Sequence, residues 1–306
     1  MININDPYVC FLRSLQHKLF HCQPYPGNSG DELIQKGTLQ LLLDLNIDVT
    51  SDPNKAEIIL YSGGCPTMHP QVIDSMRETL EMFPKAELVV GPATFQFGYT
   101  DWVEICNKYE HRIKALFARD PNSFANLQRA SLQNNTEIGL SHDPALYLRD
   151  SVWLNEHKRN NKEEYVLAAF RRDHEMKTNI ADMWMNHLQS YLPKKTFEKL
   201  THWTRKRARI RKSRIAREIS GQGLVFKEVN IVNMDFNSYV DVIRRSKEVH
   251  TDRLHVMLLA AMLGKPVFAY ETSYQKLESV YEHSLKEWAD VTFVSSKFRN
   301  NENNTK

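Results

Sequence analysis

The chain has 306 residues, of which 42% are hydrophobic, 10% aromatic and 25% charged, and its formal net charge is +3. This composition excludes a disordered, collagen-like or disulfide-stapled chain, and the length favours two domains of about 150 residues each. The four cysteines include no C-x-x-C pair. The N-terminal apolar stretch Tyr8–Leu12 is too short for a signal-peptide core, and the longest apolar run, Leu254–Leu263, is about half of what a bilayer crossing needs. We therefore expect a cytoplasmic protein with reduced thiols.

Apolar runs in the first half alternate with helical patterns, as in strands that feed the helices of a mostly parallel sheet. Strands are predicted over Tyr8–Leu12, Glu57–Tyr61, Glu87–Val90 and Ala115–Ala118, and helices over Asp31–Leu45 and Pro70–Phe83. Asp31 and Glu32 fall in the first turn of the earlier helix, where the helix dipole favours negative charge, and Pro84 ends the later helix.

A polar stretch without apolar periodicity, residues 154–164, is interpreted as a linker between a domain of residues 1–153 and a domain of residues 165–299, with a polar tail at 300–306. In the second domain, strands are predicted over residues 165–170, 224–232, 248–250, 267–270 and 291–294, and helices over 175–191, 199–219, 237–245, 252–263 and 274–288. The pattern predicts an α/β protein of two Rossmann-like domains facing a cleft, so functional residues are expected in the turns after strands.

Turns of small residues accompany the predicted strands of the first half. The loop Pro26–Glu32 leads into a helix, and the turns Ser62–Cys65 and Gly91–Thr94 each follow a strand. Glycine lets the backbone approach a ligand closely, and the N–H groups at a helix start can receive an anion or a hydroxyl. Tight packing or helix capping accounts for the same residues, so both interpretations stay open.

The segment Thr251–His255, followed by an apolar helix, is the strongest candidate site. Arg253 and His255 fall in the first turn of that helix, where an arginine fork and backbone N–H groups together bind phosphate or carboxylate. His255 is the candidate acid or base, with a structural core histidine as the alternative. Arg171 and Arg172 follow the first strand of the same domain and would extend the anion site, unless salt bridges to nearby acids engage them.

Basic residues gather in one segment. Residues 205–217 hold eight Lys or Arg and no acidic residue, which leaves 32 basic and 37 acidic residues elsewhere, a net charge of −5. With interspersed apolar residues such as Trp203 and Ile210, the segment predicts peripheral contact with the anionic inner face of a membrane. Nucleic-acid contact and a solvated helix face are the alternatives, and the acidic remainder argues against nucleic acid as the main partner.

Motifs along most of the chain resemble those of the polysaccharide pyruvyl transferase family. In chain order these are Gly27–Glu32, Gly63-Gly64, Arg119-Asp120 with Ser123, Asp143–Leu146, Thr251–His255, Gly264–Pro266 and Lys276. The run Asp252-Arg253-Leu254-His255 before an apolar helix is the most specific of them. Where the family commonly has three consecutive glycines, this chain has Ser62-Gly63-Gly64-Cys65.

The resemblance implies a glycosyltransferase-B-like fold and transfer of pyruvate from phosphoenolpyruvate, as a cyclic ketal, to a sugar of a cell-surface glycan or its lipid-linked precursor. Phosphoenolpyruvate would be a co-substrate, and neither a metal nor a further cofactor is implied. His255 and Arg253 would be catalytic. Donor binding would involve Arg171, Arg172, Arg253 and Lys276, and acceptor binding Asn28, Ser29, Asp31, Gly63 and Gly64.

Two other functions stay open. A nucleotide-sugar glycosyltransferase of the same architecture needs a carboxylate for the ribose hydroxyls, and Glu271 follows a predicted strand at a suitable place. A non-catalytic RNA-binding or membrane-scaffold protein would depend on residues 205–217.

Overall fold

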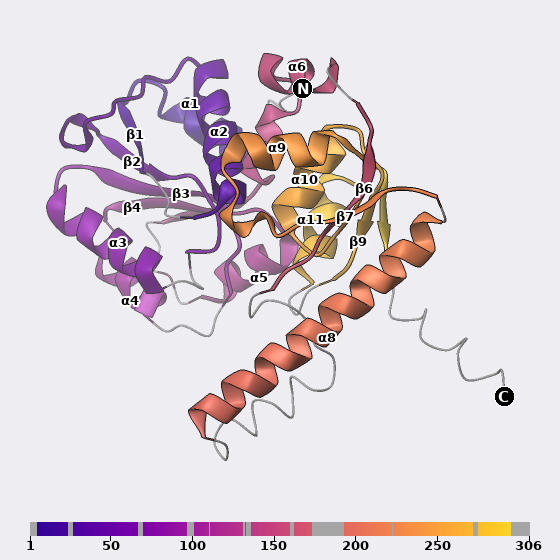
Figure 1. Ribbon diagram of the computed structural model, residues 1–306. Coiled ribbons are helices and arrows are strands. Elements are labelled where there is room, and N and C mark those ends of the chain that lie inside the picture. The colour runs from indigo at the N-terminus through magenta and orange to yellow at the C-terminus, as the bar shows by residue number, and fades with distance from the viewer. Residues whose placement is uncertain are drawn as a thin grey trace. The chain divides into compact units, whose positions relative to one another are not determined.

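The computed structural model describes residues 5–23, 27–66, 70–96, 101–109, 111–130, 132, 136–159, 162–172, 193–221, 223–271 and 275–294. The chain divides into two compact units, one made of Met1–Glu156 with Ser279–Leu285 and the other of His157–Glu278 with Lys286–Lys306. Each unit contains one five-stranded sheet (Figure 1). The helix predicted at 175–191 and the tail at 300–306 lie outside the described residues.

The sheet of the first unit is parallel throughout, in the order β1-β2-β3-β4-β5. Its strands are β1 (Phe20–Gln23), β2 (Ile58–Tyr61), β3 (Glu87–Ala93), β4 (Ile113–Ala118) and β5 (Glu137–Leu140). Its helices are α1 (Pro7–Ser14), α2 (Ser29–Asp44), α3 (Pro70–Met82), α4 (Asp101–Lys108) and α5 (Pro121–Arg129), with 3-10 turns at Pro53–Lys55 and Pro144–Leu148.

Two apolar clusters pack on opposite faces of this sheet. Successive residues of a strand point to opposite faces, and in β3 Leu88 and Val90 join one cluster while Val89 joins the other. Residues of α3, α4 and α5 complete the first cluster, and residues of α1 and α2 complete the second. The helices therefore cover both faces, as a parallel sheet requires.

The strand predicted over Tyr8–Leu12 is wrong, because these residues belong to helix α1. Asp6 caps the helix, and its Oδ1 accepts hydrogen bonds from the backbone N of Tyr8 (3.0 Å) and of Val9 (3.2 Å). Pro7 occupies the first helical position, where its missing N–H costs nothing. The outer strands β1 and β5 were not predicted.

The sheet of the second unit is also parallel, in the order β10-β9-β8-β6-β7. Its strands are β6 (Tyr165–Ala169), β7 (Phe226–Glu228), β8 (Ser246–Thr251), β9 (Val267–Ala269) and β10 (Val291–Phe293). Its helices include α8 (Lys194–Ser220), α9 (Phe236–Arg244) and α10 (Leu254–Met262), and α11 (Lys276–Ser284) starts in this unit. The α/β class with parallel sheets is thus confirmed.

Three details of the second half differ from the prediction. Of the strand predicted over residues 224–232, only Phe226–Glu228 is a strand, and Ile231–Asn233 form a 3-10 turn. Helix α6 (Val152–Arg159) occupies much of the segment interpreted as an irregular linker, because Ser151 Oγ accepts the Leu154 N–H at 3.1 Å and starts a helix whose Leu154 is fully buried. Ser279–Leu285 group with the first unit, whereas the sequence pattern places them in the second domain. No helix in the described part of the chain is long and apolar enough to cross a membrane.

Candidate functional site

Two arginine-bearing turns of the second unit meet at the carboxyl edge of its sheet. Because β6 and β8 are adjacent and parallel, the turns that follow them lie side by side. The Arg171 backbone N donates to Asp252 Oδ1 at 2.7 Å, and Thr251 Oγ1 donates to the Ala169 carbonyl at 2.8 Å. These bonds hold the Arg171–Arg172 turn beside Asp252 and Arg253, as the anion-site hypothesis requires.

A lysine of the basic helix belongs to the same edge. Lys212 of α8 donates from Nζ to Asp252 Oδ2 at 2.6 Å. The Asp252 side chain is fully buried and that of Lys212 is 13% exposed. Asp252 therefore has its charge balanced by Lys212 and its second oxygen engaged by a backbone N–H, so it serves as the anchor of this turn. From the sequence, the basic helix was interpreted as a separate feature, and Lys212 was not predicted to lie at this edge.

Arg253 and His255 lie at the start of α10. Arg253 is the N-cap residue, 7% exposed, and its side chain has no acceptor oxygen with which to cap the helix. Its backbone N donates to Thr251 Oγ1 at 3.0 Å. His255 is partly exposed, whereas the rest of α10 is buried. The positive end of helix α10 thus begins at a buried arginine, and His255 is not a fully buried core histidine.

Lys276 lies beyond the neighbouring strand β9, as the first residue of α11, and is 9% exposed. Glu271, just after the same strand, accepts hydrogen bonds from the backbone N of Leu277 (3.4 Å) and of Glu278 (2.9 Å). The Glu271 carboxylate therefore caps α11. A carboxylate engaged in this way is less suited to hold the ribose of a nucleotide.

The first acceptor candidates form the N-terminus of α2. Asn28 Oδ1 accepts the Gly30 N–H at 2.8 Å, and Asp31 Oδ2 accepts the Asn28 N–H at 2.9 Å, which together form a capping box. A Cβ atom on Gly27 would lie only 2.1 Å from Asp31 Oδ2, so a larger residue would clash there. Ser29, the first residue of α2, is buried. Helix capping thus gives these residues a structural role whether or not they contact a sugar.

Gly63 and Gly64 form a buried turn after β2. Their φ angles of 141° and 89° favour glycine, and a Cβ on Gly63 would lie 2.6 Å from the Pro92 carbonyl oxygen. Gly64 pairs with Ala93 in a parallel bridge, and its carbonyl accepts the Thr94 N–H at 2.9 Å. Tight packing against β3 thus requires glycine at position 63, and the left-handed backbone conformation favours it at position 64.

A buried ion pair joins the strand ends of the first unit. The Arg119 side chain, fully buried, donates from Nη1 to Asp143 Oδ2 at 2.7 Å and from Nε to Thr94 Oγ1 at 3.0 Å. Burial acts to lower the pKa of Arg119, but the charges of Asp143, Cys65 and Asp120 raise it above its ordinary value. The guanidinium therefore stays charged and ties together the ends of β3, β4 and β5.

Two stacked histidines extend this edge. The rings of His142, after β5, and His283, on α11, lie 4.8 Å apart. His283 Nε2 donates to the Ser141 carbonyl at 3.1 Å, and His142 Nδ1 lies 2.9 Å from Ser284 Oγ. Burial and the neighbouring His142 lower the pKa of His283. The partners are about 140 residues apart in sequence, and no local pattern predicts their meeting.

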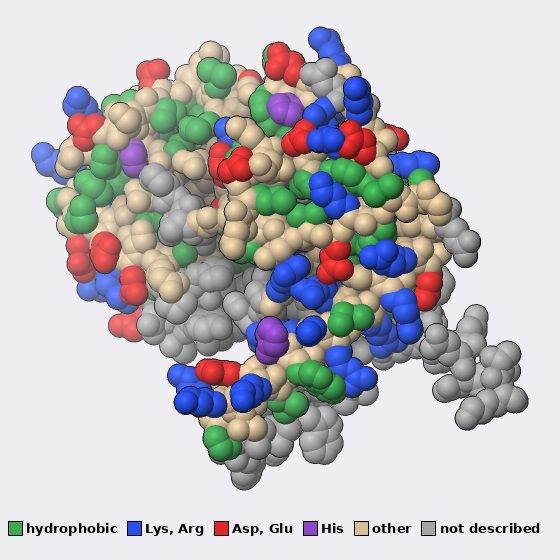
Figure 2. Space-filling model, viewed as in Figure 1, with side chains coloured by type: hydrophobic (Ala, Val, Ile, Leu, Met, Phe, Trp, Pro, Cys, Tyr) green, Lys and Arg blue, Asp and Glu red, His purple; other side chains and the backbone are tan. Residues whose placement is uncertain are grey.

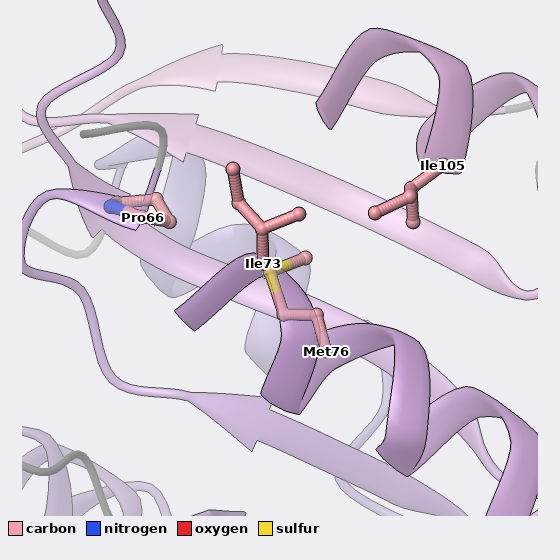
Figure 3. A pocket seen from close by; sticks show the side chains of 4 residues that line it. All are labelled: Pro66, Ile73, Met76 and Ile105. Carbon is pink, nitrogen blue, oxygen red and sulfur yellow. The ribbon is translucent and has the colours of Figure 1, made fainter. Parts of the chain in front are cut away.

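An apolar hollow lies elsewhere in the first unit, between α3 and α4 (Figure 3). It is lined by Pro66, Ile73, Met76 and Ile105. None of these side chains carries a polar group that could orient a substrate. The charged residues at the strand ends are therefore better candidates for a substrate site than this hollow.

Comparison with known proteins shows which family this sequence matches. A model of the polysaccharide pyruvyl transferase family matches residues 28–274. A functionally uncharacterized protein from Klebsiella pneumoniae subsp. pneumoniae NTUH-K2044 is similar over 97% of this chain and 100% of its own, with a TM-score of 0.64 and 21% identity. UDP-GlcNAc 2-epimerase from Methanocaldococcus jannaschii is similar over 90% of this chain and 88% of its own, with a TM-score of 0.43 and 12% identity. No curated protein matches the sequence.

The Klebsiella protein shares the fold of this chain and its description gives no activity. The family match covers the turns after β6 and β8, which carry Arg171, Arg172 and Arg253, and it ends two residues before Lys276. Because that match extends over most of the sequence, this chain belongs to the polysaccharide pyruvyl transferase family.

Proposed function

We propose that the protein transfers pyruvate from phosphoenolpyruvate to two hydroxyls of one sugar, forming a cyclic ketal and releasing phosphate. The acceptor is a cell-surface glycan or its lipid-linked precursor, and the reaction takes place in the cytoplasm. One observation carries the donor side of the proposal. The hydrogen bond from Arg171 to Asp252 brings the Arg171–Arg172 turn and Arg253 to one edge of the sheet, which agrees with the donor site that family membership implies.

The donor carries a phosphate and a carboxylate, so its pocket needs several cationic groups. Arg171, Arg172, Arg253 and Lys276 all follow carboxyl ends of adjacent strands in the second unit. Asp252 does not cancel their charge, because Lys212 already balances it. Guanidinium groups bind phosphate and carboxylate oxygens bidentately, and the N-terminus of α10 adds backbone N–H donors.

In the proposed mechanism, His255 in its protonated form donates a proton to C3 of the enol, which makes C2 electrophilic. A sugar hydroxyl oxygen then bonds to C2, and its proton passes to the neutral imidazole. A second hydroxyl of the same sugar then displaces phosphate from C2 and closes the ketal, and its proton leaves with the phosphate as hydrogen phosphate. Arg253, next to His255 at the helix start, stabilises the negative charge on the departing phosphate.

The acceptor side rests on the family alone. Family membership implies that the sugar binds to the first unit, near the N-terminus of α2 and the turn after β2. The structural roles of Asn28, Asp31 and Gly63 are compatible with sugar contact but do not require it.

The test is to incubate the protein with phosphoenolpyruvate and a panel of glycan acceptors, and to follow phosphate release together with acid-labile pyruvate on the glycan. We expect Arg253→Lys to reduce kcat/KM at least about tenfold, because lysine cannot make a bidentate contact. Arg77→Lys, on the exposed side of α3, is the matched control and should retain activity. Release of nucleoside diphosphate from a sugar nucleotide, with no phosphate released from phosphoenolpyruvate, would contradict the proposal and support a glycosyltransferase.

A further inference from the structure

Helix α8 has two differently packed parts. In its C-terminal part, Ser213 and Ala216 are buried, and Ser213 Oγ donates to Glu228 Oε2 at 3.1 Å. Arg209 Nε lies 3.3 Å from Glu228 Oε1, and the Arg217 guanidinium lies 4.1 Å from the centre of the Phe226 ring. These contacts, with that of Lys212, attach the helix to the second unit. At least three of the eight basic residues of segment 205–217, namely Arg209, Lys212 and Arg217, therefore contact residues of the second unit outside the helix.

Exposed side chains continue along the helix, and we call the series from Lys195 to Arg214 the outer face of α8. Its exposed residues include Lys195, Lys199, His202, Trp203, Lys206, Arg207, Ile210, Arg211 and Arg214, and one exposed carboxylate, Glu198, lies beside them. They recur at spacings of three and four residues, and five of them line a common hollow. Figure 2 shows this helix with Lys and Arg side chains beside hydrophobic ones.

Two large apolar side chains stand out on this face. Trp203 is 52% exposed and Ile210 is 54% exposed. They are seven residues apart, about two turns, and so lie on the same side of the helix. The Arg207 guanidinium lies 4.5 Å from the centre of the Trp203 ring. An exposed tryptophan and isoleucine flanked by cations are typical of a helix that lies in a membrane interface.

The charge of this helix differs sharply from that of the rest of the chain. Helix α8 contains 11 Lys or Arg and two acidic residues, which leaves 29 basic and 35 acidic residues elsewhere, a net charge of −6. Its 27 residues span about 40 Å. A straight cationic face of this length on an otherwise acidic chain suits a flat anionic surface.

We infer that the outer face of α8 binds an anionic lipid bilayer, with Trp203 and Ile210 inserted at the headgroup level and the surrounding Lys and Arg over the lipid phosphates. A duplex nucleic acid would match the cations but would offer Ile210 no apolar partner. The surface extends from Lys195 to Arg214, further toward the N-terminus than the segment 205–217 indicated by the sequence. The inference does not depend on which group the protein transfers.

The test is sedimentation of the full-length protein with vesicles of phosphatidylcholine alone and with about one-third phosphatidylglycerol. We expect binding to the anionic vesicles that weakens as salt is added. Each Lys or Arg near an anionic surface contributes about a fivefold factor, so Lys195→Gln, Lys199→Gln and Lys206→Gln together should weaken binding about a hundredfold. Lipid brominated in its acyl chains should quench wild-type fluorescence more than that of Trp203→Phe.

The matched control is the triple variant Lys36→Gln, Lys55→Gln and Arg77→Gln, which changes the net charge equally through exposed residues of the first unit. It should bind vesicles like the wild type. Equal loss in both triple variants would overturn the inference, as would no binding to anionic vesicles. Tighter binding to a single-stranded RNA oligonucleotide than to vesicles at the same salt concentration would also overturn it. Circular dichroism checks that each variant is folded.

Discussion

Replacing Lys212 with methionine should destabilise the second unit substantially. Methionine keeps an unbranched side chain but removes the ammonium group that lies 2.6 Å from the buried Asp252 carboxylate. Removing one partner of a buried ion pair typically costs about 3–5 kcal/mol. Because Asp252 keeps the hydrogen bond from the Arg171 backbone N, and because Lys212 is 13% exposed, we expect the lower end, about 3 kcal/mol.

Urea denaturation followed by circular dichroism measures this loss of unfolding free energy. Lys206→Met, on the exposed side of the same helix, is the control and should change stability by less than about 0.5 kcal/mol. The double variant Lys212→Met with Asp252→Asn should be more stable than Lys212→Met alone, because no buried charge then lacks its counterion. The reasoning is refuted when Lys212→Met costs no more than the control, or when the double variant recovers nothing.

The remaining predictions concern other residues of the strand ends. His255→Ala should lower turnover by a factor of about 100–10,000 in the phosphate-release assay and leave thermal unfolding nearly unchanged, because the side chain is partly exposed; unfolding of the variant would instead indicate a structural histidine. Asp143→Asn should cost about 3–5 kcal/mol in urea denaturation, because it leaves the fully buried Arg119 charge without its counterion; a neutral effect would contradict this. Folding lowers the pKa of His283 below its ordinary value of 6.5, chiefly through burial, so the folded protein favours the neutral ring. The stability that the neutral ring contributes is therefore present above pH 6.5 and is lost as the pH falls below that value. The urea midpoint should accordingly fall between about pH 7.5 and about pH 5.5, and His283→Gln should fall less over the same range; equal losses would exclude His283 as the cause.

The alternation of apolar runs and helical patterns was sufficient to predict the α/β class and most inner strands, because inner strands of a parallel sheet are continuously apolar. The outer strand β1, Phe20–Gln23, contains polar residues and has no such run. The error at Tyr8–Leu12 has a different origin. A short apolar run fits a buried strand or a helix equally well, and the capping signal of Asp6 and Pro7 decides between them.

The local sequence was also sufficient to predict the two turns that carry Arg171 and Arg253, because each turn is a motif of a few consecutive residues. It did not show that they meet through Asp252, or that Lys212 completes the contact, since these pairs are 81 and 40 residues apart. Arg119 and Asp143 were indicated only as members of two separate motifs of the family resemblance, and their ion pair was not predicted. Contacts made by the tertiary fold leave no local pattern to recognise.

Helix α11 has a practical consequence for dissecting this protein. Its residues from Ser279 onward, with Leu285 just after the helix, are part of the first unit, although about 120 residues separate them from the rest of it. A fragment ending at residue 156 would lack Ser279, whose Oγ donates to Asp120, and His283, which donates to the Ser141 carbonyl. Expression of either half by a single cut would therefore remove a piece of one core, and a first unit prepared in isolation needs this helix supplied as a fused or added peptide.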